Sequence, residues 1–114
     1  MITLYGIANC DTIKNARRWL DDHGVEYVFH DYARQGLDED RLRGWVAELG
    51  WETLINRRGT TWRKLDNGLR ETMDEEAAIR VMHAAPSIIR RPLLDTGSAR
   101  HIGFSEAAYD GIFG

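Results

Sequence analysis

The first thirty residues of the chain alternate between strand-like and helix-like patterns, and this order constrains the fold most. Residues 2–5 form a short β-prone stretch, and residues 11–23 carry apolar side chains at helical spacing. Residues 25–30 are β-branched and aromatic, which is typical of a strand, and Gly24 suits the conformation that ends a helix. A strand, a helix and a strand predict a βαβ unit, with parallel strands and a right-handed crossover.

The middle of the chain has the pattern of several helices. Asp38 and Asp74 are good N-caps for two helices, and residues 51–55 suggest a short one. Residues 56–72 are polar, basic and irregular, so we expect no regular element there. We place a helical insertion at about residues 35–83.

The last part of the chain alternates short apolar strands with turn residues. We expect strands at residues 87–89, 92–94 and 99–102, a turn at 95–98, and a final helix from residue 104. The order βαβ, helices, ββα predicts an α/β protein of the thioredoxin-like order, with a helical insertion. Its two ends form one four-stranded mixed sheet, and residues 1–114 form a single domain.

Cys10 is the single cysteine of the chain, and it lies where the first strand turns into a helix. Unsatisfied backbone N–H groups and the positive end of the helix dipole favour a thiolate there, and the thiolate is the nucleophile. Lys14, one turn further on, adds positive charge. The alternative is a buried structural cysteine, the commoner fate of a lone cysteine. Because no internal disulfide can form, redox work by Cys10 needs a second thiol on another molecule.

The composition is that of an ordinary globular protein and excludes several classes of function. Apolar residues make up 43% of the chain and the formal net charge is −3, which argues against nucleic acid held by bulk charge. We see no signal peptide and no apolar run of membrane-spanning length, so a cytoplasmic protein is the expectation. The histidines show no ligand spacing with each other or with Cys10, and we expect no metal.

Three segments together resemble the ArsC/Spx family of arsenate-reductase-like proteins, with the YffB-type branch as the nearest match. They are residues 5–16 around the cysteine, residues 54–65, and residues 86–94. The resemblance implies a thioredoxin-like fold with a helical insertion. It also implies a catalytic cysteine at Cys10, a functional arginine at Arg91, and a cis-proline at Pro92 beside the cysteine.

The chain departs from the family pattern in two respects. Members that act as disulfide switches carry Cys-x-x-Cys, whereas Ile13 stands at the fourth position here, which excludes an intramolecular switch. Arsenate reductases of the family also use further arginines around the oxyanion. This chain has Gly103 and Phe104 where one is expected and Asn56 where another is expected, which argues against arsenate reduction proper.

The candidate site combines Cys10 with a set of basic side chains. An arginine can hold a carboxylate or oxyanion by two parallel hydrogen bonds, which lysine cannot do. Arg57 and Arg58 follow Asn56, and because adjacent side chains point apart, we expect one of them to face the site. The alternative for these two is a solvated basic loop, and for Lys14 an ordinary exposed position. The predicted catalytic residues are Cys10 and Arg91; the predicted substrate-binding residues are Lys14, Arg57, Arg58, Asn9 and Pro92.

Two hypotheses of function from different classes follow. The first is a glutathione-dependent thiol/disulfide oxidoreductase, with glutathione or another small thiol as co-substrate and a glutaredoxin as a candidate partner. The second is an Spx-like regulator that binds a protein such as RNA polymerase without turnover. Arsenate reductase proper stands third. We expect a monomer with no direct contact to nucleic acid or membrane.

Overall fold

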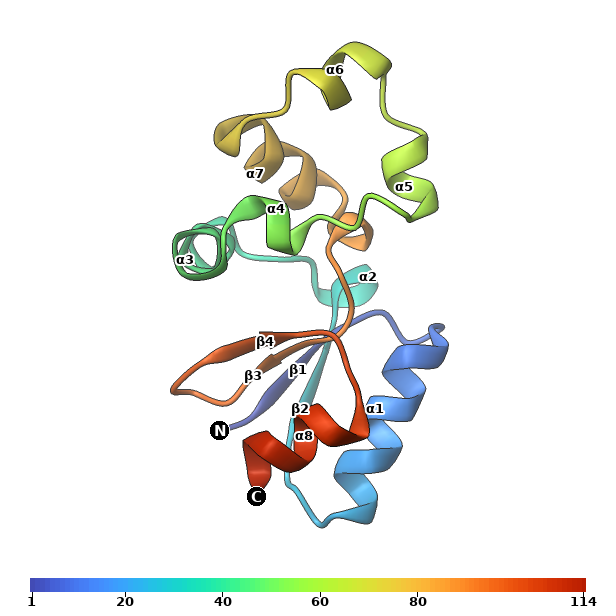
Figure 1. Cartoon of the computed structure of the whole chain (residues 1–114), viewed down its shortest axis with the longest axis vertical. Coiled ribbons are helices and arrows are strands. Elements are labelled where there is room, and N and C mark those ends of the chain that lie inside the picture. Colours follow the sequence, from blue (N-terminus) through green and yellow to red (C-terminus); the bar gives the residue numbers. More distant parts are fainter. The chain divides into compact units, whose positions relative to one another are not determined.

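The chain divides into two units, and each is built from a different kind of element. The computed structural model describes residues 1–114. The first unit, Met1–Asp31 with Arg91–Gly114, holds all strands of the sheet, and the second, Tyr32–Arg90, is helical (Figure 1). The first unit contains β1 (Thr3–Gly6), α1 (Asp11–Asp22), β2 (Val28–Asp31), β3 (Leu93–Asp95), β4 (Arg100–Ile102) and α8 (Glu106–Phe113).

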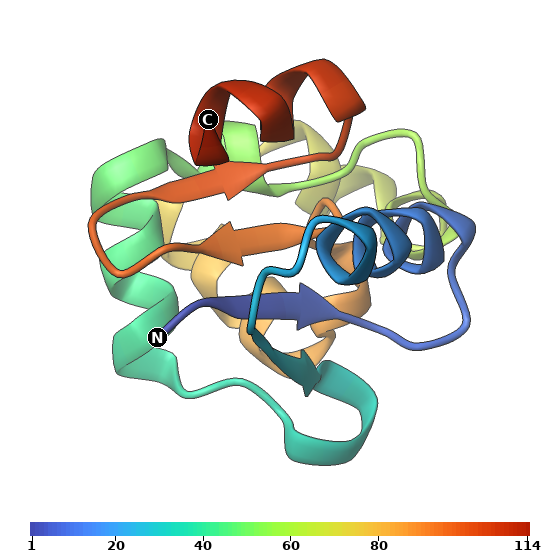
Figure 2. The same ribbon diagram turned by 90° about the horizontal axis from the view of Figure 1, so that it is seen from below.

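The four strands form one mixed sheet in the order β2-β1-β3-β4, as Figure 2 shows. β1 and β2 are parallel, whereas β3 is antiparallel to both β1 and β4. This confirms the expected α/β fold of the thioredoxin-like type, with a four-stranded mixed sheet and a helical insertion. Leu4 of β1 lies opposite Leu94 of β3, and both side chains are fully buried.

Helices α1 and α8 pack on the face of the sheet that carries Leu4 and Leu94. The buried side chains of α1 are those that the helical spacing selects: Ile13, Ala16, Trp19 and Leu20. In α8 the buried residue is Tyr109, and the helix begins where the Ser105 hydroxyl accepts a hydrogen bond from the Ala108 N–H. The amphipathic pattern of α1 therefore fixes how it meets the sheet.

The second strand begins later than the sequence pattern suggests, because the residues after α1 still belong to its C-terminal cap. Gly24 has a φ of +67°, and the N–H of Val25 donates to the Leu20 carbonyl at 3.0 Å. Pairing with the sheet starts only at Val28, whose N–H donates to the Ile2 carbonyl. The expected strand over residues 25–30 is therefore β2 over Val28–Asp31.

Two helices of the helical unit begin at the cap residues that the sequence predicts. Asp38 accepts a hydrogen bond from the Arg41 N–H, and Asp74 accepts one from the Ala77 N–H. The unit spans residues 32–90, longer than the expected 35–83. It contains α2 (Tyr32–Gln35), α3 (Glu39–Leu49), α4 (Trp51–Leu54), α5 (Thr60–Arg63), α6 (Asn67–Glu71), α7 (Glu75–Ala84) and the 3-10 helix η1 (Pro86–Ile88).

Two expectations for the helical unit were wrong. Residues 56–72 are not irregular throughout, because they contain α5 and α6; Asp66 caps α6 by accepting hydrogen bonds from the N–H groups of Gly68 and Leu69. Residues 87–89 are not a strand. Pro86 starts a 3-10 turn there, and pairing is limited to one isolated bridge between Ile55 and Ile89. Local interactions decide both segments: the Asp66 side chain satisfies the first N–H groups of α6, and the fixed φ of Pro86 suits the first residue of a helical turn.

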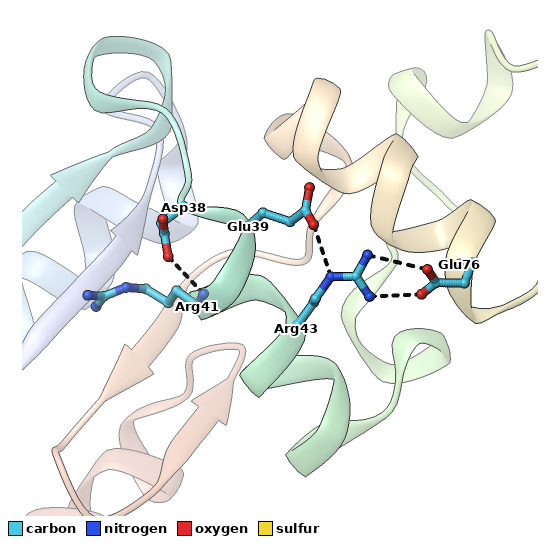
Figure 3. Close-up of polar contacts among 5 residues, drawn as sticks. All are labelled: Asp38, Glu39, Arg41, Arg43 and Glu76. Carbon is cyan, nitrogen blue, oxygen red and sulfur yellow. Dashed lines mark hydrogen bonds and ion pairs between the residues drawn. The ribbon is translucent and has the colours of Figure 1, made fainter.

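An arginine joins two helices of this unit on their exposed side. Figure 3 shows Arg43 of α3 donating to Glu39 at 3.0 Å and, through both terminal nitrogens, to Glu76 of α7 at 2.9 and 3.3 Å. The same two helices bury apolar side chains, among them Leu42 of α3 and Met82 of α7. Across the chain, every helix is too short or too polar to cross a membrane.

Candidate functional site

Cys10 is the N-cap residue of α1, with extended backbone angles (φ −150°, ψ 127°). Its carbonyl accepts the first helical hydrogen bond from the Lys14 N–H at 3.0 Å, and its own N–H donates to the Ala8 carbonyl at 3.1 Å. The thiol is free, partly exposed and caps no backbone N–H. The first-turn N–H groups of α1 therefore have no side-chain acceptor at this position, and they and the helix dipole favour a negative charge there.

Pro92 lies beside the end of β1 that leads to Cys10. The register pairs Tyr5 with Leu93, so Pro92 continues this pairing next to Gly6. The Arg91–Pro92 peptide bond is cis, as the resemblance implied, and the Pro92 carbonyl accepts a hydrogen bond from the Gly103 N–H at 2.9 Å. Proline cannot donate to a ladder, and it stands where the β1–β3 ladder ends.

Arg91 precedes this proline and is partly buried. Its side chain takes part in no hydrogen bond and no ion pair. Its Cγ lies 3.9 Å from the point where a Cβ of Gly6 would stand, so its stem lies at the end of β1. The guanidinium at the end of this partly buried side chain has no carboxylate partner within the chain. No group of the chain therefore occupies the hydrogen-bond donors of the Arg91 guanidinium.

The two residues predicted on either side of the Cys10 loop are both exposed. Asn9 immediately precedes the cysteine, and Lys14 lies one turn into α1. Neither side chain makes a hydrogen bond or ion pair within the chain. The first unit therefore brings Asn9, Cys10, Lys14, Arg91 and Pro92 to one end of its sheet.

Arg57 and Arg58 belong to the helical unit, and their surroundings differ. The guanidinium of Arg57 lies 5.7 Å from the ring centres of both Trp51 and Trp62, and 3.9 Å from a Glu52 oxygen. Arg58 is exposed; its N–H donates to the Asn56 side-chain oxygen at 3.0 Å, and its guanidinium has no partner. Arg57 is engaged within its unit, whereas Arg58 is free.

The place where arsenate reductases carry a further arginine has another role here. Gly103 has a φ of +85°, which disfavours a side chain, and it holds the Pro92 carbonyl. Phe104 packs edge-on against Tyr109, with ring centres 4.7 Å apart. Gly103 therefore anchors the backbone at Pro92 and Phe104 belongs to the aromatic core, and neither residue carries a guanidinium.

One contact at the site was missed by sequence reasoning. Gly6 ends β1, and the side chain of Ile13 occupies the space above it. The pattern assigned Ile13 to the apolar face of a helix but gave no indication of its neighbour. A glycine at the last position of a strand, just before a loop with a cysteine, is the one signal that the sequence offered. No group of three or more metal-ligating side chains is present.

The fold and the site together define the class. A mixed sheet with a partly exposed cysteine at the start of α1 and a cis-proline at the neighbouring strand is thioredoxin-like. The chain belongs to the ArsC family, whose model matches residues 5–112.

Three proteins that are similar to this chain match it over most of its length. The solved structure of a YFFB protein is 50% identical and covers 97% of each chain, with a TM-score of 0.93. An arsenate reductase (ArsC) related protein from Brucella melitensis is 46% identical, covers 98% of this chain and 93% of its own, and has a TM-score of 0.81. The global transcriptional regulator Spx of Streptococcus mutans is 32% identical over 93% of this chain and 78% of its own length.

Proposed function

We propose that the protein is a glutathione-dependent thiol oxidoreductase in which Cys10 is the nucleophile. The observation that carries this is the pairing of two unengaged groups at one end of the sheet. A partly exposed cysteine stands at the start of α1, and Arg91, whose guanidinium has no partner within the chain, precedes the proline beside β1. A nucleophile and an unpaired guanidinium at the same end of the sheet suit an anionic thiol or an oxidised substrate bearing a carboxylate.

The reaction needs three thiol–disulfide exchanges. The Cys10 thiolate attacks one sulfur of a substrate disulfide, forms a mixed disulfide and releases the other half as a thiolate. A glutathione thiolate then displaces the second half of the substrate and leaves glutathione on Cys10. A second glutathione thiolate attacks the glutathione sulfur of this mixed disulfide, which restores the Cys10 thiolate and releases glutathione disulfide. The substrate gains two electrons, and two glutathione molecules supply them.

Arg91 is proposed to hold a glutathione carboxylate by two parallel hydrogen bonds, since a guanidinium matches a carboxylate in this way. Lys14 contributes positive charge near the thiolate, and Asn9 contributes amide donors and acceptors from the loop. The two arginines of the helical unit differ in how far they are available to an anion. Arg57 is already engaged by Glu52 and two tryptophans, whereas the guanidinium of Arg58 is free.

The test is turnover of a small disulfide with glutathione, followed by recycling of the glutathione disulfide by glutathione reductase. The parent protein should exceed the rate of glutathione alone, and Cys10→Ser should abolish the excess while folding normally. Thr12→Ser, a conservative change of an exposed residue in the same helical turn, is the matched control and should keep the rate. A parent rate no higher than that of glutathione alone, or full activity of Cys10→Ser, would refute the proposal.

The second candidate is a regulator that binds a protein partner, and one finding favours it: the regulator Spx is 32% identical to the chain. Such a protein would bind RNA polymerase without turnover. Purification of the intact protein from its own cells separates the two candidates. A co-purified polymerase subunit that also binds Cys10→Ser supports the regulator. A glutathionyl adduct on Cys10, detected by mass spectrometry, supports the reductase.

A further inference from the structure

Two side chains border the space above Gly6: Ile13 of α1 and Arg91 of the candidate site. A Cβ at Gly6 would collide with Cδ1 of Ile13 and stand 3.0 Å from its Cγ1. The same point lies 3.9 Å from Cγ of Arg91, which is ordinary van der Waals distance. Gly6 is not among the glycines with positive φ. This glycine is therefore required for the space that it leaves and not for its backbone conformation.

Ile13 connects this space to the cysteine. Its side chain is fully buried, and it lies in the first turn of α1, three residues after Cys10. The hydrogen bond from the Lys14 N–H to the Cys10 carbonyl closes this turn. Because Ile13 is fully buried among close-packed neighbours, its side chain has little room to turn aside, so we expect a displacement of Ile13 to shift the first turn of α1 that carries Cys10.

We propose that Gly6 is a positioning residue that sets the geometry between Cys10 and Arg91. It lets Ile13 seat the first turn of α1 directly on the end of β1, and the stem of Arg91 lies against the same point. A methyl group at position 6 would push Ile13 outward and separate the thiol from the guanidinium. This inference rests on the proposed function, in which Arg91 binds an anion beside Cys10.

The test compares two alkylating reagents of similar size, anionic iodoacetate and neutral iodoacetamide. In both, the Cys10 thiolate displaces iodide, so the ratio of the two rates isolates the attraction of the reagent's carboxylate. A unit positive charge about 4 Å from that carboxylate raises the rate by about fivefold even in water-like surroundings. The ratio for Cys10, divided by the ratio for the thiol of free glutathione, should reach about this value.

Four variants then locate the origin of the ratio. Arg91→Ala should lower it, and Gly6→Ala should lower it by about the same factor although Arg91 is still present. Gly6→Ala/Ile13→Val should restore most of it, because valine lacks the Cδ1 atom with which the new methyl group collides, and the Cγ atom that remains at 3.0 Å needs only a small shift. Gly44→Ala is the matched control, since a Cβ there meets nothing within 4 Å, and it should keep the parent ratio.

The outcomes distinguish this inference from the proposed function. A parent ratio equal to that of glutathione, unchanged in Arg91→Ala, would remove Arg91 from the site and overturn both. A raised parent ratio that falls in Arg91→Ala but persists in Gly6→Ala would overturn the positioning role alone. Failure of the double variant to restore the ratio would do the same.

A further variant keeps the test decisive if Gly6→Ala does not fold. Ile13→Leu conserves volume but moves the atoms that lie against Gly6, and such exchanges usually leave a protein folded. It should lower the iodoacetate ratio while the unfolding midpoint stays close to that of the parent. A ratio equal to that of the parent would contradict the role of the Gly6–Ile13 contact.

Discussion

Tyr109 stands edge-on to Trp19, with ring centres 5.4 Å apart and ring planes at 89°. The tyrosine belongs to the core that joins α1 and α8 to the sheet, and it is fully buried. Its hydroxyl has no hydrogen-bond partner, and burial raises the pKa of Tyr109 above its usual range. The aromatic ring therefore stabilises the core, whereas its hydroxyl does not.

Tyr109→Phe should consequently raise the free energy of unfolding, by about 1 kcal/mol, because a buried unsatisfied hydroxyl costs roughly 1–3 kcal/mol. Tyr109→Ala should lower it by about 3–5 kcal/mol, the usual cost of removing a buried aromatic ring. Urea unfolding of the three proteins measures both. A clear loss of stability in Tyr109→Phe would mean that the hydroxyl is hydrogen-bonded in solution.

The ion pair between Arg43 and Glu76 should make a small, pH-dependent contribution to stability. Hydrogen bonds from Arg43, together with its charge, lower the pKa of Glu76 from its usual value of 4.5. A carboxyl group whose folded pKa is lowered contributes above its unfolded pKa, and the contribution disappears as pH falls through the folded value. Glu76→Gln should therefore lower the urea midpoint at pH 7 and match the parent in strong acid.

Glu75→Gln is the matched control for this pair, since Glu75 lies in the same first turn of α7 and has no ion-pair partner. In Glu75→Gln, the urea midpoint should change between neutral and acid pH by as much as it does in the parent. Because Arg43 and Glu76 are exposed, the effect of Glu76→Gln should shrink in high salt. An effect that is independent of pH would point to lost packing rather than lost charge.

Lys14→Ala should slow the alkylation of Cys10 by iodoacetamide at neutral pH, by about two- to fivefold. Lys14 lies one turn into α1 from Cys10, and its ammonium makes no hydrogen bond or ion pair within the chain, so it adds positive charge to the helix start at which an anionic sulfur reacts. Lys64→Ala, an exposed lysine of the helical unit, should have no effect. Equal rates for Lys14→Ala and the parent would make Lys14 an ordinary solvated residue.

Arg91→Lys should weaken anion binding nearly as much as Arg91→Ala, by about tenfold, because lysine keeps the charge but loses the two parallel hydrogen bonds. Calorimetric titration with glutathione and with sulfate measures the three affinities, and the thermal midpoint shows that each protein is folded. Parent-like affinity of Arg91→Lys would mean that charge alone suffices. Parent-like affinity of both variants would leave Arg91 without a binding role.

Regular elements with strong local signals were predictable from the sequence. The helical spacing of α1, the caps Asp38 and Asp74 and the turn at residues 95–98 all lie where expected, because each depends on neighbours in the chain. The position of Cys10 at the start of α1 was predictable for the same reason. The cis-bond at Pro92 came from the family resemblance and not from local pattern.

Features that depend on distant neighbours were not predictable in this way. The contact between Gly6 and Ile13 arises from how α1 lies on β1, and no spacing rule encodes it. The difference between Arg57 and Arg58 depends on two tryptophan rings and Glu52, which sequence proximity does not rank. Residues 87–89 have strand composition, yet Pro86 forces a turn there.

The pairing of Leu4 with Leu94 has a consequence for biosynthesis. Strand β1, one of the two central strands, is synthesised before the helical unit, whereas its antiparallel partner β3 is synthesised after it. Pairings between residues far apart in the chain form slowly, and the edge of β1 that pairs with β3 stays unpaired until β3 has been synthesised. A nascent chain that ends before residue 91 would carry the cysteine and its helix but not the arginine. The thiol is thus synthesised well before the group proposed to direct its chemistry.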